Sequence, residues 1–257
     1  MKRENVLTII DVGSHKLEEL FILLNPNKNQ YLTYMKWAMV KVLKAIKKLD
    51  FVKLLRSTRQ LKIIQYYFLK KKTYDIKIIS IEPNIDVAYK YVKILARKYP
   101  VYYIPVAVLG HDAIKRIELK KLFFYDKTIS NSIYRKDRPI DEGKSTICVG
   151  LKFGILWDEL IKENIIDGSD PFLLRMNCEG SELGVIEECR DKNLTPLCII
   201  GSLGDIAKIH GTQLGDKARK ILGEMGVPYF YFKGDDPSTW YGMIDIWDRY
   251  TSKHLKK

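Results

Sequence analysis

Short apolar runs alternate along the chain with segments whose apolar residues recur at helical spacing. The predicted strands cover residues 6–12, 76–81, 102–109, 172–176, 196–200 and 229–232, with residues 114–125 as a further extended edge. The predicted helices cover residues 17–24, 88–99, 156–163, 183–190 and 218–225, and a last helix begins at Asp236 and Pro237. Alternation of this kind predicts an α/β fold in which helices cover both faces of a mostly parallel sheet.

Polar residues follow several of these strands directly. The first strand leads into Asp11-Val-Gly13-Ser14-His15, the second into Glu82-Pro83-Asn84, and the fourth into a stretch that runs from Asn177 to Glu182. In parallel α/β sheets, ligands bind beyond the carboxyl ends of the strands. Glycine lets a backbone turn tightly beside a ligand, and a carboxylate at a strand end can accept both hydroxyl hydrogens of a ribose. These stretches are therefore the candidate site.

Residues 26–75 interrupt this alternation with a lysine-rich helical pattern. Apolar residues recur at helical spacing at Met35, Met39, Val42, Leu43, Ile46 and Leu49, with lysines on the other side of the helix. A second helical stretch covers residues 59–72. We expect a single domain of residues 1–257 that carries residues 26–75 as an inserted basic arm.

The charge of the chain is concentrated in that arm. The 257 residues carry a net charge of +13, and residues 36–72 hold twelve basic side chains and one acid, Asp50, which amounts to +11. Such an excess favours a polyanionic partner bound through Lys36–Lys72: an anionic membrane surface, an acidic glycan or a nucleic acid. The alternative is a helical hairpin packed on the body, with its lysines simply solvated.

Composition excludes several other classes of protein. No stretch approaches the roughly 20 uncharged apolar residues that span a bilayer, and the N-terminus lacks the features of a signal peptide. The four cysteines form no C-x-x-C pair and have no metal-like spacing with the four histidines. We therefore expect no metal and a cytoplasmic protein with reduced thiols, peripheral at a membrane surface if the arm binds lipid.

Four stretches, in order, resemble the FkbM-type methyltransferases: IIDVGSH, ISIEPN, IPVAVLG and LLRMNCEGSELGVIEE. The resemblance covers roughly residues 6–24 and 76–200. It implies a Rossmann-like sheet of the class I methyltransferase type and an enzyme that uses S-adenosylmethionine. It also implies O-methylation of a hydroxyl, most simply on a sugar of a glycan or glycolipid.

The resemblance assigns a role to each matching residue. The methionine part of the cofactor would be lined by Asp11, Gly13, Ser14 and His15. The ribose would be held by Glu82, and the adenine would be flanked by Pro83, Asn84, Val106 and Ala107. The transferred methyl group and the acceptor would face Asn177 and Glu179, with Glu179 as the first candidate base and His15 or His111 as the second.

One departure from the family pattern keeps other readings open. Leu17 stands where the family has the second glycine of its first motif, and a leucine there would crowd the cofactor. A relative that has lost catalysis and binds a polyanion is therefore one alternative. The excess of positive charge supports another, methylation of a nucleic acid or nucleotide.

Overall fold

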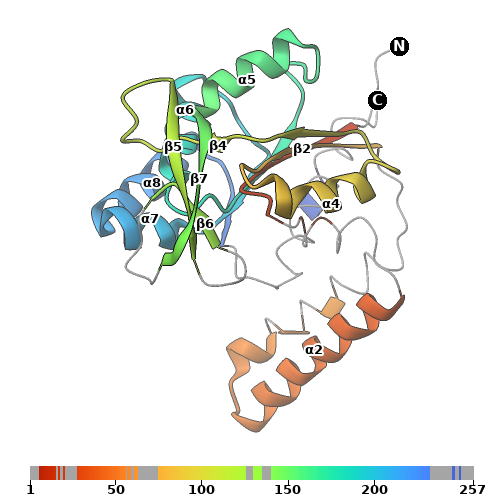
Figure 1. The fold of residues 1–257 in the computed structure, drawn as a ribbon. Coiled ribbons are helices and arrows are strands. Elements are labelled where there is room, and N and C mark those ends of the chain that lie inside the picture. Colours follow the sequence, from red (N-terminus) through yellow and green to blue (C-terminus); the bar gives the residue numbers. More distant parts are fainter. Residues whose placement is uncertain are drawn as a thin grey trace. The chain divides into compact units, whose positions relative to one another are not determined.

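The computed structural model describes residues 6–15, 17, 20, 28–55, 57–58, 61–62, 75–125, 130–134, 140–231, 245–246 and 249. The chain divides into two compact units. The sheet unit comprises Met1–Lys16 and Asp75–Phe232, and the arm unit comprises Leu17–Tyr74 and Lys233–Lys257. Figure 1 shows the elements of both.

A six-stranded sheet forms the centre of the sheet unit. Its strands are β1 (Val6–Val12), β2 (Asp75–Ile81), β3 (Val101–Ile104), β8 (Phe172–Met176), β9 (Cys198–Gly201) and β10 (Tyr229–Tyr231). All its strand pairs are parallel, and the order is β3-β2-β1-β8-β9-β10. The order therefore reverses between β1 and β8, as in doubly wound sheets.

The strands are mostly apolar because the sheet is buried on both faces. Ile10 and Ile79 are neighbours on one face, Ile9 and Ile78 are neighbours on the other, and all four are fully buried. The helices of this unit are α4 (Ile85–Leu95), α5 (Phe153–Lys162), α6 (Glu182–Asp191), α7 (Leu203–His210) and α8 (Thr212–Met225). Side chains from α5, α6, α7 and α8 share one core cluster with Ile10 and Ile79. The α/β fold with a parallel sheet is thus confirmed.

A second, four-stranded sheet has the order β4-β7-β5-β6. It consists of β4 (Ala107–Val108), β5 (Ile117–Tyr125), β6 (Ser130–Ser132) and β7 (Ile140–Leu151). The predicted strand 102–109 is wrong as a single element, because the chain leaves the first sheet after Ile104 and joins the second at Ala107, with Pro105 between them. The prediction of residues 114–125 as an edge is also wrong, since β5 lies between β6 and β7.

In the arm unit, α2 (Lys28–Lys47) confirms the first predicted helix of the basic arm. A short helical stretch at residues 51–55 follows it. The predicted helices at residues 17–24, 59–72 and from Asp236 fall largely outside the described residues. In the part of the chain that the structure describes, no helix is long and apolar enough to cross a membrane.

Candidate functional site at the strand ends

The carboxyl ends of β1, β2 and β8 meet at the point where the strand order reverses. Register pairs Val12 with Ile81 on one side and with Met176 on the other. The next residues are held together by backbone hydrogen bonds: the N–H of Gly13 donates to the Ile81 carbonyl (2.8 Å), and the N–H of Asn177 donates to the Val12 carbonyl (2.9 Å). Three stretches that are far apart in the sequence therefore share one edge.

The backbone at Gly13 lies directly against the end of β8. Its φ is +74°, in the left-handed region that favours glycine. A Cβ built on Gly13 would lie 2.2 Å from the carbonyl oxygen of Asn177, far inside van der Waals contact. Any side chain at Gly13 would force the end of β8 away from the end of β1.

Glu82, at the end of β2, is buried and faces the turn after β1. Its Oε2 accepts the backbone N–H of His15 (2.9 Å), and its Oε1 accepts the backbone N–H of Asn84 (2.9 Å). Burial raises the pKa of Glu82, while these two N–H donors act in the opposite direction. Each carboxylate oxygen has further acceptor capacity, so Glu82 can bind a ligand hydroxyl from a fixed position.

Asp11 lies on β1, two residues before Gly13, and forms a buried ion pair with a residue of the neighbouring strand β8. The Nη1 of Arg175 on β8 donates to Asp11 Oδ1 (2.9 Å) and to the carbonyl oxygen of Gly13 (2.5 Å). Both side chains are almost fully buried. Arg175 therefore links β8 to β1 and holds the turn at Gly13 in place.

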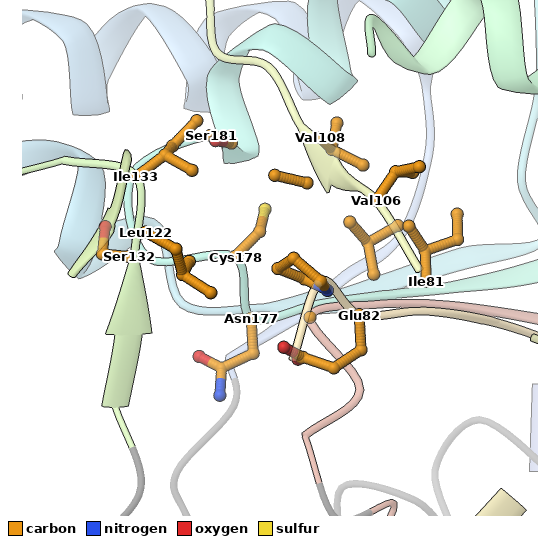
Figure 2. A pocket seen from close by; sticks show the side chains of 14 residues that line it. Ile81, Glu82, Val106, Val108, Leu122, Ser132, Ile133, Asn177, Cys178 and Ser181 are labelled. Carbon is orange, nitrogen blue, oxygen red and sulfur yellow. The ribbon is translucent and has the colours of Figure 1, made fainter. Parts of the chain in front are cut away.

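These strand ends line a small open pocket within the sheet unit, with about 40 Å³ of space accessible to a water-sized molecule. Its apolar walls come from two directions: Figure 2 shows Ile81 and Val106 on one side, and Leu122 of β5 and Ile133, the residue after β6, on the other. The Asn177 carboxamide and the Glu82 carboxylate lie on the same side of the pocket in that view. The pocket combines a slot for a flat apolar group with polar groups at one end, a usual composition for a small-molecule site.

The loop after β8 is held in shape by a buried carboxylate. Glu182 Oε1 accepts the N–H of Cys178 (3.0 Å), and Oε2 accepts the N–H of Gly180 (2.8 Å). Glu179 and Gly180 both adopt positive φ, +55° and +115°, so the loop turns sharply. Ser132 Oγ also donates to the Glu179 carbonyl oxygen (3.0 Å), which joins the loop to β6.

The structure brings six of the predicted site residues into the pocket lining: Gly13, Glu82, Pro83, Val106, Ala107 and Asn177. Five others lie near the strand ends but are not in the lining: Asp11, Ser14, His15, Asn84 and Glu179. Ser14 is fully buried, and its hydroxyl lies 2.8 Å from that of Ser80. His111, the other histidine considered as a base, is also outside the lining and packs edge-on against His210, with ring centroids 4.8 Å apart.

Sequence reasoning missed the part of the lining that β5, β6 and the residue after β6 supply, namely Leu122, Ser132 and Ile133. No local pattern marks these residues, because only the pairing of β5 and β6 carries them to the pocket. It also missed Arg175, although an arginine in an apolar strand beside a strand that contains an aspartate is a signal for a buried pair. Among the described residues, no group of three or more His, Cys, Asp or Glu side chains is placed to hold a metal ion.

The fold and site define an α/β protein with a pocket at the switch point of a parallel sheet. Comparison with known proteins does not narrow this class, because no protein-family model, curated protein or solved structure matches the chain.

Proposed function

We propose that this chain is an S-adenosylmethionine-dependent O-methyltransferase of the class I type, acting on a hydroxyl of a sugar in a glycan or glycolipid. The observation that carries the proposal is the hydrogen bond from the His15 N–H to Glu82 Oε2. It brings the glycine turn after β1 and the acid after β2 into direct contact, and those are the two stretches that the resemblance assigns to the cofactor.

The residues of the pocket suit an adenosyl group. Glu82 has a buried carboxylate for the two ribose hydroxyls, and the slot beside it, between Ile81, Val106 and Leu122, suits a flat adenine ring. The missing side chain of Gly13 leaves its backbone open to the methionine part. Asp11 and Ser14 would act indirectly, since their side chains already bind within the protein and support that turn.

The sulfonium methyl of the cofactor, when bound, supplies a strong electrophile, so the chain has to position an acceptor and remove a proton. Asn177 is in the pocket lining, and its carboxamide can hold the acceptor hydroxyl. A sugar hydroxyl is a weak acid, so a base must accept its proton as the new bond forms. Glu179, two residues further along the same loop, is the base that we propose.

Leu17 does not argue against a cofactor. Leu17 is not among the described residues that line the pocket. The backbone of Leu17 has φ +56°, the left-handed conformation that glycine favours. The backbone turn that a glycine would make is therefore present despite the leucine.

Isothermal titration calorimetry with S-adenosylmethionine tests the proposal. We expect binding by the full chain and a loss of at least tenfold in affinity for Glu82→Ala, because a charged hydrogen-bond acceptor contributes roughly 1.5–3 kcal/mol. Glu224→Ala on the exposed side of α8 is the matched control and should bind like the unaltered protein. Absence of heat at millimolar cofactor, or equal affinity for both variants, would contradict the proposal.

The acceptor is tested separately, by transfer of labelled methyl to a glycolipid and to RNA. We expect label in the glycolipid, with Glu179→Gln reducing the rate by about 100-fold or more and leaving cofactor affinity unchanged. Label in RNA alone would replace the sugar hydroxyl by a nucleic-acid acceptor.

A further inference from the structure

The helix α2 exposes an apolar stripe to solvent. Leu32, Met39, Leu43 and Ile46 follow one another at spacings of seven, four and three residues, so they lie on one side of the helix. Each of these four side chains is exposed by 50% or more. Ala38 and Ala45, on a neighbouring side of the helix, are buried. The helix therefore uses its small residues for packing and leaves its large apolar residues outside.

The turn after α2 continues this surface with still more exposed residues. Exposure reaches 77% for Leu49, 72% for Phe51, 71% for Val52 and 74% for Leu55. Leu49 also has φ +50°, a conformation that costs a branched side chain free energy and that glycine or asparagine adopts readily. An exposed leucine in a left-handed turn contributes little to the stability of the fold. This points to a role of Leu49 in contacting a partner.

Exposed cations surround these apolar residues: Lys36, Lys44, Lys47, Lys48 and Lys53. The single acid in this stretch, Asp50, is used by the fold. Its Oδ1 accepts the backbone N–H of Lys53 (3.0 Å) and caps the helical residues 51–55, while Oδ2 pairs with Lys53 Nζ (2.6 Å). The surface is therefore apolar and cationic, without an acid that faces a partner.

We propose that residues 32–55 dock the protein on an anionic lipid surface, with the exposed apolar residues in the headgroup region and the lysines on lipid phosphates. The charge is complementary to such a surface, and Leu32, Met39, Leu43, Ile46, Leu49, Phe51, Val52 and Leu55 gain free energy only by leaving water. A single-stranded nucleic acid fits less well, because it needs aromatic side chains for stacking and Phe51 is the only aromatic one among the side chains of residues 32–55 that the structure describes.

This proposal does not depend on the methyltransferase activity, and it is tested with the full chain and vesicles. Co-sedimentation should show binding to vesicles of phosphatidylcholine that contain about 30% phosphatidylserine. This content gives the vesicles a strong negative surface potential. Binding should weaken as salt is raised, and it should be weak for phosphatidylcholine alone. The double variant Phe51→Ser/Leu55→Ser should lower the partition coefficient by about tenfold or more.

Leu49→Asn separates lipid binding from folding. Asparagine tolerates the left-handed turn, so this variant should unfold at the same or a higher urea concentration and still bind vesicles less tightly. Leu119→Asn is the matched control, since Leu119 on β5 is 75% exposed but lies in the sheet unit. It should bind vesicles like the unaltered protein.

Three results would overturn the proposal. One is equal binding to anionic and neutral vesicles, and another is an equal loss of binding in Leu119→Asn and Leu49→Asn. The third is no vesicle binding together with tight binding of single-stranded oligonucleotides, which would assign the surface to a nucleic acid.

Discussion

At the scale of single residues, the buried carboxylate of Glu182, which holds the site loop, makes the stability of the fold depend on pH. Its carboxylate is fully buried and accepts the N–H groups of Cys178 and Gly180. Burial is the main cause that raises the pKa of Glu182 from 4.5 to about 7. The folded chain therefore holds a proton on Glu182 in a pH range where the unfolded chain has released it.

The sign of the effect follows from this difference in proton binding. Between pH 4.5 and about 7 the folded state binds more protons, so the free energy of unfolding should fall as pH rises. In Glu182→Gln nothing ionises at this position, and the fall from pH 4.5 to 8 should be smaller by on the order of 3 kcal/mol. Urea unfolding of both proteins at several pH values measures this.

The comparison is internally controlled. Burial lowers the pKa of His210, which destabilises the fold at acid pH, but this contribution is present in both proteins and cancels in the difference. Glu224→Gln, an exposed change on α8, should leave the pH profile as it is. A Glu182→Gln profile parallel to that of the unaltered protein would show that Glu182 is ionised throughout this range.

At the scale of elements, the ion pair between Asp11 and Arg175 joins β1 to β8 at the base of the pocket. Removing one partner leaves the other charge buried without compensation, so Arg175→Met should lower the free energy of unfolding by about 3–5 kcal/mol. The double variant Asp11→Asn/Arg175→Met should recover part of that loss. A double-mutant cycle by urea unfolding measures the coupling.

An exposed pair of the same chemistry provides the control. Arg219 and Asp216 are one turn apart on α8 and 2.9 Å from each other in solvent. Arg219→Met should change the free energy of unfolding by no more than about 1 kcal/mol. Equal losses for Arg175→Met and Arg219→Met would mean that the buried pair has no special weight in joining the strands.

Elements that carry their own local signal were predictable from the sequence. The strands at Val6–Val12 and Phe172–Met176 coincide with the predicted residues, because a strand buried on both faces is a mostly apolar run. The 12-residue strand β7 and the helix α7 were missed. Much of β7 is polar, IDEGKST before ICVGL, and its partner β5 is distant in the sequence, so its pairing has no local signature.

The site residues that directly follow a recognisable strand were also predictable from the sequence. Gly13, Glu82 and Asn177 follow recognisable strands, and a parallel sheet brings such ends together. The placement of the two loop carboxylates depends on loop geometry, because between Asn177 and Glu182 two successive residues, Glu179 and Gly180, have positive φ. That backbone path buries Glu182 and leaves Glu179 outside the lining, and residue types alone do not reveal it.

At the scale of the whole molecule, chemistry and charge reside in different units. The described residues that line the pocket all belong to the sheet unit. The positive excess of the chain lies mostly in residues 36–72, in the arm unit, with +11 of the net +13. The pocket is lined by described residues of the sheet unit and the charge excess lies in the arm unit, so each can be tested by its own variants.

The concentration of charge predicts how salt acts on stability. Lys47 and Lys48 follow Lys44 by three and four residues at the end of α2, and both repel it. Raising sodium chloride from about 10 to 150 mM shortens the Debye length from roughly 30 to 8 Å and screens this repulsion. We therefore expect the free energy of unfolding to rise, by about 1 kcal/mol for several such pairs. In Lys44→Gln/Lys47→Gln/Lys48→Gln the rise should be smaller.

A second triple variant tests whether position or total charge matters. Lys162, Lys208 and Lys220 each pair with an acid on their own helix, so their attraction is what salt weakens. Replacing these three by glutamine removes the same total charge but takes away favourable pairs, and the salt-induced rise should persist or increase. If both triple variants respond to salt alike, net charge alone governs stability. If the salt-induced rise in the free energy of unfolding is smaller only in the α2 variant, the repulsion lies in residues 32–55, the surface that we propose binds an anionic membrane.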